Sequence, residues 1–231
     1  LKMIAVAGTH GKTTTTAMLI WLAKKIQLPA AYIVGSTLNF APSGSYQPHD
    51  RYFIYEADEY DRNFLHYHPW LSLITFVSFD HPDIYSTEQE YRDAFLSFEK
   101  QSEFLIFANQ AAAPSDLTQI TEKNPLILMQ PDSRLTLAGQ ARREDANLVF
   151  AAAKQILRDL SNFSENSTSK NNISENNPNV ITPVSQDTSN VITPVSQDIP
   201  DDIILNILNQ FPGVGRRFER LSDGLYSDYA H

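Results

Sequence analysis

The chain has 231 residues, of which 42% are hydrophobic, so it is long enough to bury one or two sizeable cores. Its 18 basic and 27 acidic residues give a formal charge of −9 and form no basic stripe, which argues against nucleic acid as a partner. The chain has no cysteine, no signal-peptide pattern and no run of roughly 18 apolar residues, which excludes disulfides and thiolate metal sites and predicts a cytoplasmic protein without membrane contact.

The sequence opens with an apolar run that leads into a loop of the kind that binds phosphate. Residues 4–16 read IAVAGTHGKTTTT, a predicted strand that ends in a loop bounded by Gly8 and Gly11. Glycine lets backbone N–H groups approach an anion closely, Lys12 supplies a point charge for β- and γ-phosphate oxygens, and Thr13 offers a hydroxyl to Mg²⁺. This order of strand, loop and basic residue predicts a site for nucleotide phosphates.

The helix predicted over residues 14–25 would direct the positive end of its dipole toward the same anion. The cofactor-binding residues that we predict in this loop are Gly8, Thr9, His10, Gly11, Lys12, Thr13 and Thr14. The usual phosphate-loop motif has one more glycine, at the position that Val6 occupies here. A glycine-rich turn that only starts a helix is therefore the alternative interpretation.

Apolar runs alternate with helical patterns along the rest of the chain, which predicts an α/β fold with a mostly parallel sheet flanked by helices. The predicted strands are 3–7, 30–34, 52–56, 71–76, 104–109 and 126–129. The predicted helices are 14–25, 87–99, 116–123, 143–160 and 203–211. Ligands on such sheets bind at the carboxyl ends of strands, so the residues after Ala7, Tyr55 and Val77 should converge on one edge.

An acidic segment follows the third predicted strand and reads YEADEYDRNFL over residues 55–65. Glu56 ends that strand at the same edge as the phosphate loop, where a carboxylate can complete the coordination of Mg²⁺. Asp58, Glu59 and Asp61 follow within five residues. Acidic residues favour the first turn of a helix, so we interpret these three as a solvated helix start rather than as further site residues.

The segment SFDHPDIY, residues 78–85, follows the next strand. Its His81 can be a metal ligand, a phosphate donor or an ordinary loop residue. The position of His81 beside two other strand ends favours a role in the site. We therefore expect Thr13, Glu56 and His81 to lie around one Mg²⁺–phosphate site.

Residues 161–202 are rich in Asn, Ser, Thr and Pro, and they contain the direct repeat NVITPVSQD at 179–187 and 190–198. We expect a low-complexity, disordered insertion between two helices. A β-hairpin is the alternative, although Pro183 and Pro194 argue against central strands.

Near the end of the chain, GVGRRFERL places Arg217 after a glycine turn, and Asp228 follows. An arginine can stabilise the charge of a transferring phosphoryl group, and a carboxylate can accept a hydrogen bond from a ribose hydroxyl. Because surface arginines are common, these residues alone leave the function open.

Five blocks, in this order, resemble the phosphate-loop central domain of the Mur ligases: GTHGKTTTTAM, EADEYDRNFLHYHP, FDHPDIY, FPGVGRRFE and DYAH. The similarity spans nearly the whole chain except residues 161–202, and it is strongest to ligases that join L-alanine to UDP-N-acetylmuramate. The resemblance implies an ATP- and Mg²⁺-dependent ligase of peptidoglycan biosynthesis, a process of cell-wall growth, cell shape and division. In this family ATP phosphorylates the muramoyl carboxylate, and the amino group of alanine attacks the acyl phosphate.

The resemblance also implies roles for individual residues. Lys12 would contact phosphate, Glu56 and Thr13 would bind the first magnesium ion, and His81 would bind a second metal ion. Arg217 would lie near the γ-phosphate, and Asp228 would bind ribose. The implied catalytic residues are thus Lys12, His81 and Arg217.

The chain departs from the family pattern at two places. Phe76 stands where the family has an asparagine. In the run that contacts adenine, Asn147 keeps the last asparagine, whereas Arg143 and Glu144 replace a His-Asn pair. The replaced adenine run predicts weaker nucleotide affinity, whereas the phosphate loop keeps its motif.

By this resemblance, residues 1–227 form the central ATP-binding domain and residues 228–231 begin a C-terminal domain. We therefore expect the middle of a longer protein, inactive as an isolated fragment. The alternatives are a related ligase that recycles murein peptides by joining a tripeptide to UDP-N-acetylmuramate, a non-catalytic nucleotide-binding module and, more distantly, a phosphate-loop kinase or GTPase.

Overall fold

The computed structural model describes residues 1–109, 125–128, 130–171, 198–215, 219–222 and 225–227. Seven strands form one sheet in the order β3-β2-β4-β1-β5-β6-β7. These strands are β1 (Lys2–Ala7), β2 (Ala30–Ile33), β3 (Gly44–Ser45), β4 (Tyr52–Glu56), β5 (Leu71–Ile74), β6 (Phe104–Phe107) and β7 (Leu126–Ile127). All neighbours in the sheet are parallel except β2 and β3. The predicted α/β class with a mostly parallel sheet is therefore confirmed.

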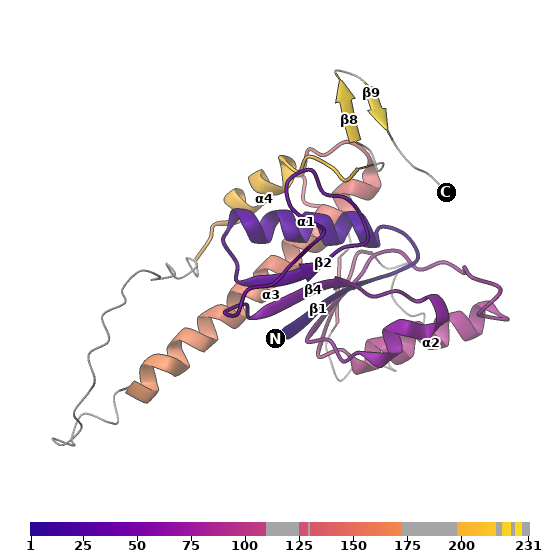
Figure 1. Cartoon of the computed structure of the whole chain (residues 1–231), viewed down its shortest axis with the longest axis horizontal. Coiled ribbons are helices and arrows are strands. Elements are labelled where there is room, and N and C mark those ends of the chain that lie inside the picture. The colour runs from indigo at the N-terminus through magenta and orange to yellow at the C-terminus, as the bar shows by residue number, and fades with distance from the viewer. Residues whose placement is uncertain (110–124, 129, 172–197, 216–218, 223–224, 228–231) are drawn as a thin grey trace.

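Helices cover both faces of this sheet (Figure 1). The α-helices are α1 (Lys12–Lys25), α2 (Glu88–Gln101), α3 (Gln140–Asn171) and α4 (Asp201–Asn209), and a 3-10 helix, η1, spans Tyr60–His66. One layer contains α1, α3 and α4, which contact one another, and the other contains α2 and η1. A small antiparallel pair, β8 (Glu219–Ser222) and β9 (Leu225–Ser227), forms a second sheet.

Strand β1 lies in the centre and divides the core into two clusters. Its side chains alternate, as in any strand, so Ile4 and Val6 pack under α1 and α3 while Ala5 and Ala7 face the other layer. The small Ala5 and Ala7 side chains leave room for a layer rich in aromatic rings around Phe64. The buried part of the strand, Ile4–Ala7, leads directly into the phosphate loop.

Most predicted elements are present, with shifted ends. Helix α1 begins at Lys12, and α2 begins after Thr87, whose hydroxyl accepts a hydrogen bond of 3.1 Å from Glu90 N as an N-cap. Helix α3 runs to Asn171, so the helix extends into the segment that we expected to be disordered from residue 161. The predicted helix at 116–123 lies outside the described residues. So do both copies of the nine-residue repeat, except for the last residue, Asp198.

Among the residues that the structure describes, every helix is too short or too polar to cross a membrane.

Candidate nucleotide-binding site

The phosphate loop depends on two glycines with positive φ. Gly8 has φ 134°, and a Cβ atom there would lie 2.2 Å from Thr75 Oγ1. Gly11 has φ 87°, and a Cβ atom there would lie 2.9 Å from Asp145 Oδ1. No L-side chain fits either position without displacement of its neighbours. The neighbouring residues therefore require glycine at both positions, as expected for a loop whose backbone approaches an anion closely.

The loop is anchored to the segment after β5. Thr9 N donates to Phe76 O at 2.6 Å, and the Thr9 hydroxyl donates to Ser78 O at 2.8 Å and accepts from Ser78 N at 3.0 Å. The rings of His10 and Phe76 stack with centroids 6.1 Å apart. Phe76, at the position where an asparagine was expected, therefore supports the loop and is itself 42% exposed.

Helix α1 presents its first turn to this loop. Gly11 is its N-cap and makes no side-chain cap, and the first intrahelical bond runs from Thr15 N to Gly11 O at 2.9 Å. The N–H groups of Lys12, Thr13 and Thr14 belong to the first turn, where an α-helix leaves such groups without intrahelical partners. This geometry suits an anion.

The ammonium group of Lys12 lies inside the loop. Its Nζ atom donates to Gly8 O at 2.7 Å and lies 2.8 and 3.0 Å from the two carboxylate oxygens of Glu59. The side chain of Lys12 is 17% exposed and that of Glu59 is 1% exposed. The pair is therefore almost completely removed from water.

The interpretation of Glu59 as part of a solvated helix start is wrong. A helix does begin after it, and Asp58 and Asp61 are exposed as expected, but Glu59 is completely buried. Its carboxylate also lies 3.7 Å from His81 Nε2. Sequence reasoning missed the burial of Glu59 because its partner Lys12 is distant along the chain. The local signal is that every second residue, Tyr55, Ala57 and Glu59, is buried, as in a strand.

Glu56 meets the helix start from the other side. Thr13 Oγ1 donates to Glu56 Oε2 at 3.1 Å, and Gly35 N donates to Glu56 Oε1 at 3.0 Å. Glu56 ends β4, where it pairs in register with Val6 of β1. A hydroxyl and a carboxylate side by side are hard oxygen donors of the kind that Mg²⁺ accepts.

His81 does not join this pair but lies with Lys12 and Glu59. Its backbone has φ 54°, and its ring contacts that of Tyr60 edge to face, with centroids 5.2 Å apart. Within the described ranges, no three His, Asp or Glu side chains form a ready-made metal site. The metal set of Thr13, Glu56 and His81 stays a prediction, of which the structure directly pairs the first two.

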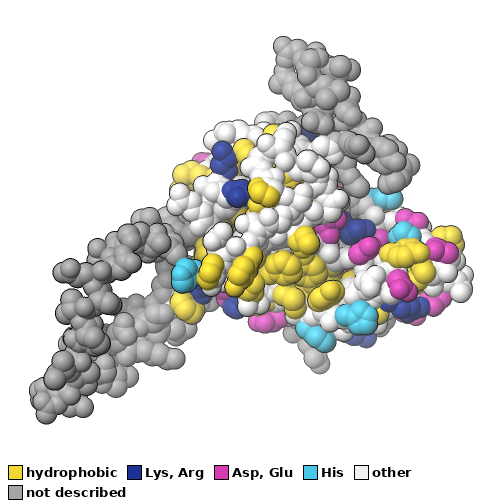
Figure 2. Space-filling model, viewed as in Figure 1, with side chains coloured by type: hydrophobic (Ala, Val, Ile, Leu, Met, Phe, Trp, Pro, Cys, Tyr) yellow, Lys and Arg dark blue, Asp and Glu magenta, His cyan; other side chains and the backbone are white. Residues whose placement is uncertain are grey.

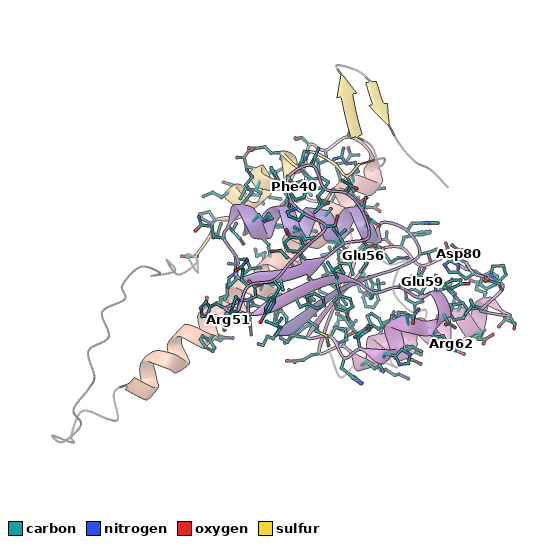
Figure 3. The ribbon with its side chains drawn as sticks, viewed as in Figure 1. Phe40, Arg51, Glu56, Glu59, Arg62 and Asp80 are labelled. Atoms are coloured by element: carbon teal, nitrogen blue, oxygen red, sulfur yellow. The ribbon has the colours of Figure 1, made fainter. Side chains whose placement is uncertain are left out.

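Acidic, basic and histidine side chains gather on the side of the molecule that carries α2 (Figure 2). Figure 3 shows Glu56, Glu59 and Asp80 near one edge of the sheet and Arg51 near the opposite edge. The strand ends therefore converge on one edge, at the point where β4, β1 and β5 lie next to one another.

Helix α3 adds a carboxyl group that sequence reasoning missed. Asp145 is buried beside Gly11, and burial raises its pKa to about 7. Asn147, the predicted adenine contact, uses its amide elsewhere: it accepts from Asp132 N and donates to Gln130 O, both at 3.2 Å. Its side chain thus fixes the segment after β7.

The two residues that replace the His-Asn pair make local bonds at the start of α3. Arg143 donates to Leu137 O at 3.1 Å, and Glu144 accepts from Gln140 at 2.8 Å. Arg217 and Asp228 lie outside the described residues. The described glycine turn before Arg217 contacts the loop after β2, because Gly215 N donates to Thr37 O at 3.4 Å.

Curated proteins with a similar sequence include several UDP-N-acetylmuramate–L-alanine ligases. The UDP-N-acetylmuramate–L-alanine ligase of Lactobacillus helveticus is 39% identical over 104 residues, which cover 45% of this chain and 22% of that protein. The ligase of the same name from Lactiplantibacillus plantarum is 43% identical over 105 residues, covering 46% and 23%. The similarity thus spans less than a quarter of the length of these relatives.

Solved structures share the fold. The UDP-N-acetylmuramate-alanine ligase of Thermotoga maritima aligns with a TM-score of 0.61 at 20% identity, covering 100% of this chain and 51% of that one. A UDP-N-acetylmuramate:L-alanyl-gamma-D-glutamyl-meso-diaminopimelate ligase from Neisseria meningitides aligns with a TM-score of 0.53 at 23% identity, covering 67% and 61%. The model of the Mur ligase middle domain matches residues 6–130, more than half of the chain, and the chain therefore belongs to the Mur ligase family.

Proposed function

We propose that this chain is the ATP-binding part of a ligase that joins L-alanine to UDP-N-acetylmuramate in peptidoglycan biosynthesis. The observation that carries the proposal is the phosphate loop itself: Lys12 at the start of α1, with the Thr13–Glu56 pair beside it. The names of the curated relatives support the choice of substrates. Such a ligase would work in the cytoplasm.

In this proposal the phosphates of ATP lie at the start of α1. The N–H groups of the first turn donate to phosphate oxygens, and the Lys12 ammonium neutralises part of their charge. Thr13 and Glu56 fit Mg²⁺ because they offer a hydroxyl and a carboxylate that already lie 3.1 Å apart. When bound, Mg²⁺ would supply positive charge that lets two anions approach each other.

The reaction would pass through an acyl phosphate formed on the muramoyl carboxylate, which the amino group of alanine then attacks. His81, near the same loop, would serve a second metal ion, and Arg217 would stabilise the transferring phosphoryl group. Asp228 would bind ribose. The amide of Asn147 is bonded to the segment after β7, so Asn147 would have to release those bonds to contact adenine.

We further propose that residues 1–227 are the middle domain of a larger enzyme and that residues 228–231 begin the next domain. The chain spans a fraction of the length of its curated relatives, and the acyl phosphate must be kept from water. We therefore expect the 231-residue chain alone to bind ATP weakly and to lack ligase activity.

The test is an assay of amino-acid-dependent phosphate release with ATP, Mg²⁺ and UDP-N-acetylmuramate, on the polypeptide as it is made in its own cell. We expect release that requires L-alanine. A requirement for a tripeptide would instead identify a ligase of murein-peptide recycling. Nucleotide binding without release under any amino acid or peptide would identify a non-catalytic module.

A further inference from the structure

The contact between Lys12 and Glu59 occupies the ammonium group that the proposed phosphate site needs. Lys12 Nζ lies 2.8 and 3.0 Å from the carboxylate oxygens of Glu59, 2.7 Å from Gly8 O and 3.4 Å from Thr9 O. An ammonium carries three hydrogens, and four oxygens surround it here. In this arrangement Lys12 has no hydrogen left to donate to a phosphate.

Glu59 is held firmly in its position. The Tyr85 hydroxyl donates to Glu59 O at 2.6 Å, and the Tyr91 hydroxyl lies 3.5 Å from Glu59 Oε1. The chain turns sharply just beyond, since Asp61 and Arg62 have φ values of 52° and 58°. The carboxylate is therefore fixed by its surroundings, whereas the lysine has a long side chain that can rotate. When a phosphate approaches, the lysine is the partner that moves.

We propose that Glu59 competes with nucleotide phosphates for Lys12 and thereby makes the site select the magnesium-bound nucleotide over the free one. The proposal rests on the proposed function, because it assumes that Lys12 serves phosphate. Without a metal ion, phosphate must take Lys12 from a buried carboxylate and also approach that carboxylate's negative charge. A nucleotide that carries Mg²⁺ brings its own positive charge, so the same carboxylate opposes it less.

The geometry explains why Glu59 rather than its neighbours has this role. Asp58 and Asp61 are exposed, so water screens their charges, whereas Glu59 is completely buried and makes contact with both the lysine and His81. The exposed Asp61 therefore provides a matched control. Asp61→Asn removes the same formal charge two residues away and leaves the Lys12 contact intact.

The experiment compares Glu59→Gln, Asp61→Asn and the unmodified 231-residue chain by calorimetric titration with tripolyphosphate and with ATP. Each titration is done in a chelator and again with Mg²⁺. In the chelator, Glu59→Gln should bind tripolyphosphate and ATP roughly fivefold more tightly, the size of one partly screened charge interaction. With Mg²⁺ the gain should be smaller, and Asp61→Asn should match the unmodified chain in both conditions.

A second readout separates competition from a merely structural role. Glu59→Gln should lower the melting temperature of the ligand-free chain, because Lys12 loses its ionic partner, and should increase the stabilisation produced by tripolyphosphate. If Glu59→Gln does not fold, Glu59→Asp, which withdraws the carboxylate by one methylene, should also tighten binding in the chelator.

The inference fails if the folded Glu59 variants bind as tightly as the unmodified chain or more weakly, or if Asp61→Asn produces the same gain. In either case the proposed function stands as long as the unmodified chain binds ATP with Mg²⁺. If the unmodified chain binds neither ligand with or without Mg²⁺, the nucleotide site itself is wrong, and this inference falls with it.

Discussion

The hydroxyl of Thr13 donates a hydrogen bond of 3.1 Å to Glu56 Oε2. This bond links the first turn of α1 to the end of β4. The same carboxylate accepts from Gly35 N through its other oxygen. Glu56 therefore joins the phosphate loop to the loop after β2, and in the proposed function its charge would help to hold Mg²⁺.

Glu56→Gln keeps the shape and one acceptor of this side chain but removes its charge. We expect the gain in ATP affinity that Mg²⁺ provides to fall by roughly tenfold or more, while binding of tripolyphosphate in a chelator is maintained. Titrations with and without Mg²⁺ measure both. Asp58→Asn, at an exposed acidic residue nearby, is the control and should behave as the unmodified chain. An unchanged magnesium dependence in Glu56→Gln would remove Glu56 from the metal site.

Lys12 and Glu59 should be coupled in stability. Lys12→Ala leaves a carboxylate that is 1% exposed without its cation, which should cost about 3–5 kcal/mol of unfolding free energy. Adding Glu59→Gln to Lys12→Ala removes the unpaired charge and should recover much of this loss. Urea unfolding of both single variants and of the double variant gives the coupling energy. Independent, additive losses would show that the contact contributes little.

The carboxyl group of Asp145 should make the protein less stable as the pH rises. Burial raises its pKa from 3.8 to about 7, so between these values the folded chain holds a proton that the unfolded chain releases. Asp145 therefore leaves the free energy of unfolding unchanged below pH 3.8, lowers it increasingly between pH 3.8 and about 7, and lowers it by a constant amount above pH 7. Asp145→Asn should therefore be more stable than the unmodified chain at pH 8, by on the order of 2 kcal/mol, and no more stable at pH 4. Denaturant unfolding at the two pH values checks this, and an equal difference at both would contradict it.

Glu99, near the C-terminal end of α2, should also make the protein less stable as the pH rises, over a slightly wider pH range. Burial raises its pKa from 4.5 to about 8, and its Oε2 atom has no hydrogen-bond partner among the residues that the structure describes. Glu99→Gln should stabilise the fold at pH 8, by on the order of 3 kcal/mol, with the gain lost as the pH falls to 4.5.

The matched control for Glu99 is Glu103→Gln, which changes an exposed carboxylate in the same region. It should alter the unfolding free energy by less than about 0.5 kcal/mol at either pH. A loss of stability in Glu99→Gln at pH 8 would mean that the carboxylate has a stabilising partner.

The features that the sequence predicted well are those fixed by local pattern. The phosphate loop follows from Gly8, Gly11 and Lys12, and the central strands follow from short, mostly apolar runs, which are typical of a parallel sheet covered on both faces. Strand β3 was missed because Gly44–Ser45 is too short to carry a pattern, and it exists only through its pairing with β2.

The features that the sequence did not predict depend on contacts between distant residues. Glu59 is buried because Lys12 and His81 surround it, and Asp145 is buried because α3 packs against Gly11. Neither environment can be read from neighbouring residues. Helix α3 continues past residue 161 because, once a helix has formed, each added residue gains a hydrogen bond, and Ser and Asn reduce helix propensity only modestly.

The C-terminal half of α3 contacts the edge of the sheet opposite the phosphate loop. Asp159 accepts a hydrogen bond of 2.8 Å from the Tyr52 hydroxyl and pairs with Lys2, and the guanidinium of Arg51 lies 3.7 Å from the centre of the Phe163 ring. Asp159 and Phe163 of α3 therefore lie on the side of the sheet away from the phosphate loop. Because the chain has no cysteine and Asn162 is exposed at this edge, a single Asn162→Cys substitution would carry a thiol-reactive reporter away from the phosphate loop.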